Sequence, residues 1–210
     1  MTLDKQQCWQ AIDTHRSALV GVLDQLTEPE WATPSLCDGW TVREVVGHFT
    51  IQQVALSDAL RMAVKARGNT ERAIREHAAA RALLPTAQLV AQFRAQIGTR
   101  RHAPLVTYRE LLIDVLVHSL DITIPLGREL ALPTAAAATA ATRVRTMRWP
   151  VNPWNRLHGI RLVATDADWA GGDGAEVSGP INAILLVLTG RRIGLDRLTG
   201  PGLTRLAAIA

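Results

Sequence analysis

The segment SLCDGWTVREVVGHFT, residues 35–50, contains the most clearly marked helix start in the chain. Thr41 is a good helix N-cap, and Glu44 three positions later completes a capping box. Apolar residues then recur at helical spacing, which predicts an amphipathic helix facing a core: Val42, Val45, Val46 and Phe49. His48 lies at the edge of this apolar stripe. Taken alone, it is best interpreted as a histidine at the edge of the core, satisfied by one hydrogen bond.

The composition is that of a globular protein. Of the 210 residues, 48% are hydrophobic and 20% are charged, which allows a substantial buried core. The apolar runs are too short to span a bilayer, and the N-terminus lacks the pattern of a signal peptide. The two cysteines, Cys8 and Cys37, favour a reducing compartment over a disulfide framework. We therefore expect a cytoplasmic protein without a membrane partner.

The charge pattern argues against a nucleic-acid partner. The formal net charge is +4, but the basic residues are scattered among Asp and Glu, and only 4% of residues are aromatic. Nucleic-acid binders usually combine a basic stripe with aromatic side chains that stack on bases. We therefore attribute the basic balance to an arginine-rich composition.

Hydrophobic periodicity predicts four long helices in the first two thirds of the chain. They cover residues 3–26, 41–66, 85–97 and 107–124. The long connection between the second and the third, residues 68–84, permits a crossover. This set of elements is typical of a four-helix bundle.

The sequence pattern of the remaining chain predicts a mixture of helices and strands. We expect an alanine-rich helix at 134–147, a proline-containing linker at 149–155, a strand at 160–166, a glycine-rich hairpin at 170–179, a helix at 180–191 and a last strand at 203–209. The fold prediction is therefore mainly α. A helical bundle at residues 1–150 is followed by a small α+β domain at 151–210, which packs on the bundle because it is too small to be stable alone.

The helix expected at 107–124 carries two residues that suggest chemistry. Asp114 and His118 are spaced to share one helical face. An acid and a histidine inside a bundle are costly unless they are paired or bound to a metal. Together with His48, they would match the three-ligand pattern of a catalytic zinc site with an open position. The alternative is a buried Asp–His hydrogen bond without a metal, which the spacing by itself favours.

Three blocks of sequence, in this order, resemble the mycothiol-dependent maleylpyruvate isomerase family. They are SLCDGWTVREVVGHFT, the helix with acid-x-x-x-His, and a tail reading VATDADWAGGDGAEVSGPINAILLVLTGR and then LTG. The resemblance covers most of the chain. It implies a DinB-like four-helix bundle that binds a divalent metal, usually zinc, followed by a small C-terminal domain.

The resemblance also implies the ligands. In the family, a histidine of the second helix and a glutamate and a histidine of a later helix hold the metal. The matching positions here are His48, Asp114 and His118. Asp114 departs from the family pattern, which generally has Glu at this position. Aspartate is one methylene shorter but is a competent zinc ligand.

Further residues have competing interpretations. Arg191 resembles an arginine that faces the active site in the family, which implies a catalytic role. Alternatively, its charge complements the dipole of the preceding helix, and Arg192 is the second choice for the catalytic arginine. Cys37 could be a fourth ligand, a redox thiol or a small buried side chain, and we favour the last. Asp121 either accepts a hydrogen bond from His118 or helps to close the helix.

The resemblance implies a metal-dependent enzyme with mycothiol, a low-molecular-weight thiol, as cofactor. It would be a cis–trans isomerase or a thiol S-transferase acting on small electrophilic carboxylates, and the sequence leaves this choice open. The expected partners are a small-molecule substrate and the thiol, in a monomer or homodimer. The alternative is a non-catalytic binding module for a small hydrophobic ligand, because the C-terminal part also resembles small sterol-carrier-like domains.

Overall fold

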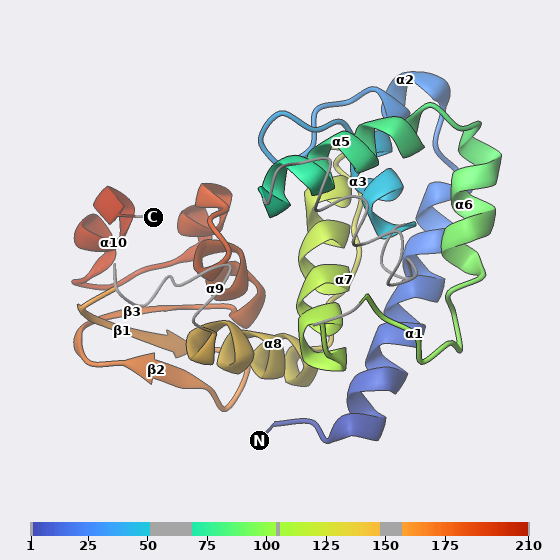
Figure 1. Cartoon of the computed structure of the whole chain (residues 1–210). Coiled ribbons are helices and arrows are strands. Elements are labelled where there is room, and N and C mark those ends of the chain that lie inside the picture. Colours follow the sequence, from blue (N-terminus) through green and yellow to red (C-terminus); the bar gives the residue numbers. More distant parts are fainter. Residues whose placement is uncertain (1, 51–68, 104–105, 148–156, 210) are drawn as a thin grey trace. The chain divides into compact units, whose positions relative to one another are not determined.

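The computed structural model describes residues 2–50, 69–103, 106–147 and 157–209 (Figure 1). The chain divides into two compact units, each described by itself below. One unit is Ile12–Leu130, and the other combines Met1–Ala11 with Ala131–Ala210. None of the described helices is both long and apolar enough to span a membrane.

The unit Ile12–Leu130 is built from helices. They are α1 (Lys5–Leu23), which begins in the other unit, α2 (Glu28–Trp31), α3 (Val42–Phe49), α5 (Thr70–Ala82), α6 (Thr86–Arg94) and α7 (Tyr108–Thr123). The expected mainly helical fold is confirmed. The part of the second expected helix beyond residue 50 lies outside the described residues. Helix α5 occupies most of the connection that we expected before the third helix.

Helix α3 begins where its sequence predicts. The Thr41 backbone N–H donates to Glu44 Oε2 at 2.7 Å, and the Glu44 backbone N–H donates to Thr41 Oγ1 at 3.3 Å. This reciprocal capping satisfies two backbone donors that a helix start would otherwise leave open. The predicted apolar stripe is buried: Val42, Val45, Val46 and Phe49.

Helix α7 is buried along most of its length, from Leu111 to Thr123. A second capping box fixes its start, because the Thr107 backbone N–H donates to Glu110 Oε2 at 2.8 Å. Helix α1 lies beside it (Figure 1), and a 2.6 Å hydrogen bond joins His15 Nε2 on α1 to Ser119 Oγ on α7. Helix α1 is therefore a direct neighbour of α7 at Ser119.

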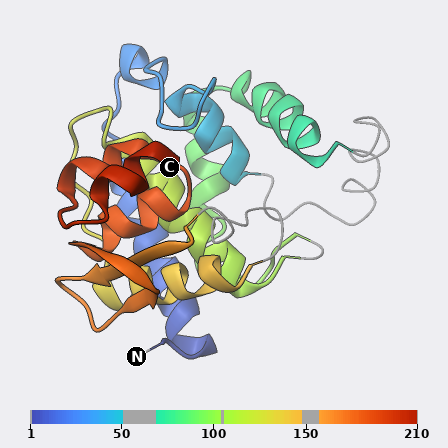
Figure 2. The same cartoon turned by 90° about the vertical axis from the view of Figure 1, so that its left-hand side faces the viewer.

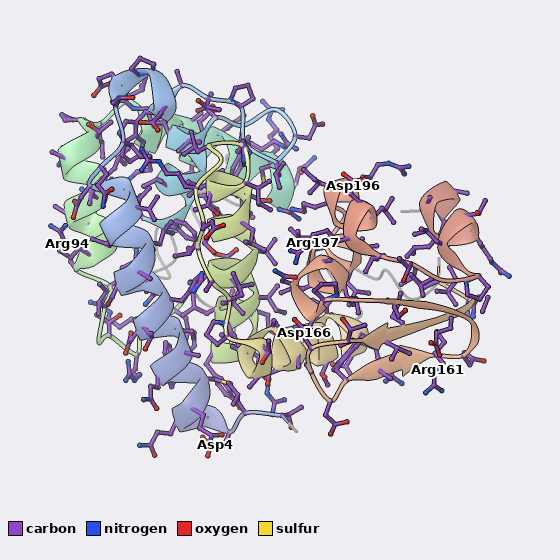
Figure 3. The ribbon with its side chains drawn as sticks, turned by 180° about the vertical axis from the view of Figure 1, so that it is seen from behind. Asp4, Arg94, Arg161, Asp166, Asp196 and Arg197 are labelled. Carbon is purple, nitrogen blue, oxygen red and sulfur yellow. The ribbon has the colours of Figure 1, made fainter. Side chains whose placement is uncertain are left out.

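Surface and packing contacts connect the other helices of this unit. Arg94, labelled on α6 in Figure 3, pairs with Asp24 just after α1 at 2.5 Å. Helices α3 and α5 approach closely at Gly47, where an added Cβ would lie 2.7 Å from the Ala78 carbonyl oxygen. A side chain at this position would force the two helices apart.

The other unit contains α8 (Thr134–Thr146), strands β1 (Gly159–Ala164), β2 (Ala170–Gly172) and β3 (Gly174–Gly179), then α9 (Ile181–Leu188), the 3₁₀ helix η2 (Arg192–Arg197) and α10 (Leu203–Ile209). The sheet order is β2-β1-β3, with β2 antiparallel and β3 parallel to β1. The red C-terminal helices lie on one side of the orange strands (Figure 2). Asp166, labelled in Figure 3, accepts a 2.7 Å hydrogen bond from the Ile181 backbone N–H at the start of α9.

Two expectations for this unit are wrong. The glycine-rich segment 170–179 is not a hairpin, because its two strands pair with β1 on opposite edges. Gly174 lies so close to Gly159 that a Cβ on Gly174 would lie 2.3 Å from the Gly159 carbonyl carbon. Glycine is therefore needed here for the close approach of the two strands as well as for a turn. Residues 203–209 form helix α10 instead of a strand, and β3 is joined by a bridge from Ser178 to Thr199.

Helix α8 groups with the C-terminal elements. Trp169 Nε1 donates to Thr142 Oγ1 at 2.9 Å, and the Leu3 backbone N–H donates to Thr139 Oγ1 at 2.9 Å. The unit boundary near residue 131 thus precedes the division at 150 that the sequence suggested. The expected linker at 149–155 lies outside the described residues, and the domain division at 150 stays a prediction.

Candidate metal centre

The structure brings the three predicted ligands together within the helical unit. His48 is in the last turn of α3, and Asp114 and His118 are on one face of α7. His48 Nε2 lies 3.2 Å from Asp114 Oδ1, and His118 Nε2 lies 3.4 Å from the same oxygen. One ligand atom from each residue lies within 4.8 Å of the others.

The two separations from Asp114 Oδ1 fit a tetrahedral zinc ion. Zinc bonds to imidazole nitrogen and carboxylate oxygen of about 2.0–2.2 Å put neighbouring ligand atoms about 3.3–3.5 Å apart at the tetrahedral angle. The two measured separations, 3.2 and 3.4 Å, are close to these values. Two imidazoles and one carboxylate also leave a position open, as catalytic zinc sites do. The donor set therefore fits the metal, while its ligand role stays a prediction.

The side chains of the three candidate ligands are largely buried but remain partly accessible to solvent. The exposed fractions of the side chains are 12% for His48, 14% for His118 and 28% for Asp114. Aromatic rings surround the histidines: the Trp40 ring centroid lies 5.5 Å from that of His48 and 6.4 Å from that of His118, and Phe49 lies 6.0 Å from His118. The cluster is thus a polar group with a largely apolar surround.

The electrostatics of the cluster favour a bound cation. Burial raises the pKa of Asp114, but the charges and hydrogen bonds of His48 and His118 outweigh it and hold this pKa well below its usual value. Burial lowers the pKa of His118, but Asp114, Asp121 and Cys37 outweigh it and raise this pKa well above 6.5. A proton on His118 thus occupies a place where positive charge is stabilised.

Asp121 and Cys37 lie on the far side of the His118 ring. Asp121 Oδ2 accepts a 2.7 Å hydrogen bond from His118 Nδ1, and the Asp121 side chain is fully buried at 0% exposure. Cys37 Sγ lies 3.5 Å from Asp121 Oδ2 and 3.7 Å from His118 Nδ1. These three residues are a second group with metal-ligand chemistry. Of the two interpretations of Asp121, the contact with His118 is the one observed.

Arg191 lies in the other compact unit, directly before η2. Its Nη1 donates to the Thr189 carbonyl oxygen at 2.5 Å, at the C-terminal end of α9. This contact agrees with the interpretation in which the charge complements the helix dipole. Arg192 is exposed, and its Nη2 donates to the Ala207 carbonyl oxygen at 2.9 Å. A catalytic role for Arg191 stays a prediction.

Sequence reasoning missed the residues that surround the ligands. Arg16 on α1 is fully buried, and its Nη1 donates to the Gln96 carbonyl oxygen at 3.0 Å. Burial lowers its pKa to about 10, against the attraction of Asp13 and Asp114. A signal was available, because Arg16 shares a helical face with Ile12 and Leu19, both of which are buried. The position of Trp40 had no such signal, since it lies in a loop.

Comparisons with known proteins agree with this picture. Residues 12–105 match the family model described as mycothiol maleylpyruvate isomerase N-terminal domain, a range that includes His48 and ends before Asp114. A crystal structure of the mycothiol-dependent maleylpyruvate isomerase is similar, with a TM-score of 0.67, 19% identity, and coverage of 96% of this chain and 95% of that chain. A mutant of that enzyme with one histidine changed to alanine gives a TM-score of 0.66, 18% identity, and coverage of 96% and 95%.

No curated protein matches the chain. At the identity of the solved structures, their similarity establishes the fold, over nearly the whole chain. The predicted DinB-like bundle followed by a small α+β lobe is thereby confirmed. The resemblance that the sequence suggested is confirmed as well, by the family model in the N-terminal domain and by the fold elsewhere.

Proposed function

We propose that this chain is a metal-dependent enzyme that uses mycothiol to convert a small electrophilic carboxylate, in the manner of a maleylpyruvate isomerase. The observation that carries the proposal is the cluster of His48, Asp114 and His118, which has zinc-like geometry inside a bundle of the matching fold. The match of residues 12–105 to the family's N-terminal domain supports the same reading.

In this proposal His48 and His118 bind the metal through Nε2, and Asp114 binds it through Oδ1. Zinc held by these residues would supply an open position that lowers the pKa of a thiol, so that the thiol would be a thiolate at neutral pH. Two neutral imidazoles and one carboxylate leave the ion a net positive charge, which favours an anionic fourth ligand. The Trp40 and Phe49 rings beside the histidines lower the local polarity, which strengthens this attraction.

The remaining roles belong to residues that orient the ligands and the substrate. Asp121 accepts the hydrogen bond from His118 Nδ1–H, which keeps the proton on Nδ1 and leaves the Nε2 lone pair for the metal. Arg191 binds the substrate carboxylate, since a guanidinium presents a planar fork of donors to it. Two outcomes fit this arrangement, cis–trans isomerisation and thiol transfer, and they differ in whether the product retains the thiol. Cys8 and Cys37 are not joined in a disulfide, which fits a cytoplasmic location.

The test combines metal analysis with thiol dependence. Protein purified without an affinity tag should contain about one zinc per chain, as expected for a three-ligand catalytic site. A screen of small unsaturated carboxylates, with maleylpyruvate first, should show turnover only when mycothiol is present. A product that keeps the thiol identifies a transferase. A folded protein that binds no metal and shows no thiol dependence would refute the proposal and favour the non-catalytic binding module.

A further inference from the structure

Asp121 is a buried carboxylate, and its burial must be compensated by other contacts. It lies one turn after His118 on α7, and its side chain is 0% exposed. A carboxylate removed from water is costly unless hydrogen bonds compensate it. His118 Nδ1 provides one such bond at 2.7 Å. The Leu36 backbone N–H also donates to the Asp121 carbonyl oxygen at 3.1 Å, so the loop before α3 is tied to the same turn of α7.

Cys37 provides a second donor to this carboxylate. Its Sγ lies 3.5 Å from Asp121 Oδ2, and the turn that carries it is itself ordered by Ser35. Ser35 Oγ accepts from the Cys37 backbone N–H at 3.1 Å and donates to the Trp40 carbonyl oxygen at 2.9 Å. The thiol is therefore held against Asp121 by a fixed turn.

The two histidines of the candidate metal centre differ in the hydrogen bonding of their Nδ1 atoms. His48 Nδ1 is buried and has no hydrogen-bond partner among the described residues. His118 Nδ1 is held by Asp121, which fixes the ring orientation and places the second nitrogen, Nε2, 3.4 Å from Asp114 Oδ1. The orientation of the His118 ring toward the candidate metal position thus depends on its hydrogen bond to Asp121.

We infer that Asp121 and Cys37 act as a positioning pair, in which the Cys37 thiol and the His118 Nδ1–H both donate to the Asp121 carboxylate and so present His118 Nε2 to the metal. This inference rests on the proposed metal site. It gives Cys37 a role different from a fourth ligand and from a redox thiol, because the thiol donates to Asp121 and lies against the Nδ1 side of His118.

Cobalt substitution separates these roles. A thiolate bound to Co²⁺ produces an intense sulfur-to-cobalt charge-transfer band in the near ultraviolet, whereas nitrogen and oxygen ligands give only weak d–d bands. Wild-type protein loaded with Co²⁺, without added thiol, should therefore show no charge-transfer band. A strong band that disappears in Cys37→Ala would show that Cys37 is a ligand and would overturn the inference.

Zinc affinity gives the quantitative test. Asp121→Ala should raise the zinc Kd about 10- to 100-fold, as the loss of a partner of a metal-bound histidine typically does. Asp121→Asn should raise it less, because the amide oxygen still accepts the Nδ1 proton. Cys37→Ala removes a weak donor and should raise the Kd about 2- to 10-fold. Cys37→Ser should stay near the wild-type value, since a hydroxyl donates to the same carboxylate.

The chain offers a matched control in Ser119→Ala. This change removes the hydrogen bond to His15 from the neighbouring position of α7, also in the buried interior, but it touches neither His118 nor Asp121. It should lower the stability of the fold and leave the zinc Kd and the Co²⁺ spectrum unchanged. A similar loss of zinc affinity in Ser119→Ala would mean that the Asp121 effect reflects a general loosening of α7, which would also overturn the inference.

A measurement without metal keeps this inference distinct from the proposed function. In metal-free protein at alkaline pH, ¹⁵N spectra should show neutral His118 protonated at Nδ1 in the wild type and a shift toward the Nε2–H tautomer in Asp121→Ala. If wild-type protein binds no zinc, the proposed function fails while this result still supports the positioning pair. If Asp121→Ala changes neither the tautomer nor the zinc Kd, the positioning pair is refuted even when zinc binds.

Discussion

Asp114 is the residue of the candidate metal centre that contacts both histidines. It is shorter than the glutamate that the resembling family generally has, yet one of its oxygens lies within 3.2 Å of His48 and 3.4 Å of His118. Because both histidines share one carboxylate oxygen, the loss of any one residue leaves the other two without a complete binding site.

We predict that His48→Ala or His118→Ala abolishes stoichiometric zinc binding and leaves the helices largely folded. The bundle buries enough apolar surface to fold without the metal, unlike a zinc finger. Asp114→Glu should keep the metal, because a glutamate side chain carries the same donor group. Metal analysis together with far-ultraviolet circular dichroism checks both results. Full zinc occupancy in the His48→Ala/His118→Ala double mutant would show that the ligands are elsewhere.

His15 gives a second prediction at this scale, on pH. Its Nε2 donates to Ser119 Oγ, because the Ser119 hydroxyl itself donates to the Leu116 carbonyl oxygen at 2.8 Å. Burial lowers the pKa of His15 from 6.5 to about 4. Between these two pH values the unfolded chain binds a proton that the folded chain does not, so stability falls as pH falls through this window.

The loss attributable to His15 should reach about 3 kcal/mol of unfolding free energy, completed near pH 4. Urea unfolding at several pH values measures it in metal-free protein. His15→Gln keeps a side-chain donor without a titrating group, so its stability should vary less over the same pH range. An identical pH profile in wild type and His15→Gln would contradict this assignment.

At the residue scale, the sequence predicted the site only in part. Helical spacing placed Asp114 and His118 on one face, and the structure brings His48 next to them. The contacts of Cys37 and Trp40 could not be predicted, because both lie in a loop whose path is set by long-range bonds such as Leu36 to Asp121. Periodicity reports which face of a helix is buried, but not which atoms of other segments meet it.

At the scale of elements, glycines show how packing overrides local preference. Gly47 lies in α3 where an added Cβ would be 2.7 Å from the Ala78 carbonyl oxygen and 3.3 Å from the Ala82 backbone nitrogen, both in α5. Gly21 lies in α1 with no atom within 4 Å of the same construction. The two positions therefore form a matched pair.

We predict opposite effects for alanine at these two positions. Gly21→Ala should stabilise the protein by about 0.5–1 kcal/mol, through higher helix propensity. Gly47→Ala should destabilise it by about 1–3 kcal/mol, because backbone atoms of a packed helix cannot move aside cheaply. Chemical denaturation of both variants gives the comparison. Equal stabilisation by both would show that α3 and α5 do not pack as closely as described.

The elements that the sequence misassigned depend on partners distant in the chain. The glycines of 170–179 signalled a turn correctly, but pairing with β1 on opposite edges is a property of the whole sheet. Residues 203–209 are apolar enough for a strand, but Leu206 is buried while its neighbours Thr204 and Arg205 are exposed, which is the spacing of a helix. The starts of α3 and α7, which have strong caps, were predicted closely because their start signals are local.

At the scale of the whole molecule, the two compact units have different contents. The helical unit Ile12–Leu130 holds all three candidate ligands, and the unit that ends at Ala210 holds the sheet and Arg191. A metal centre by itself can hold a thiol, but it offers no cation dedicated to a substrate carboxylate. The proposed activity needs a cation for the substrate carboxylate, and Arg191 is the residue that the resemblance indicates.

We predict that Arg191→Ala leaves zinc occupancy unchanged and lowers kcat/KM for the carboxylate substrate. Loss of a charge-assisted bond in a sheltered site costs about 2–4 kcal/mol, which corresponds to a reduction of about 30- to 1,000-fold. Arg191→Lys should recover only part of the activity, because an ammonium group cannot make the paired contact of a guanidinium. Steady-state kinetics with mycothiol and the substrate found in the screen measure these effects.

Arg192→Ala is the matched control, since it removes the same side chain from the next position. Arg192 is exposed and contacts the Ala207 carbonyl oxygen, so its loss should change kcat/KM little. Wild-type turnover by Arg191→Ala would show that the arginine serves only the end of α9, where it already donates to Thr189. A large loss in Arg192→Ala alone would exchange the roles of the two residues. A loss of activity in Arg191→Ala but not in Arg192→Ala would instead show that the C-terminal unit takes part in the reaction. The reason is that Arg191 lies outside the unit that holds the candidate ligands.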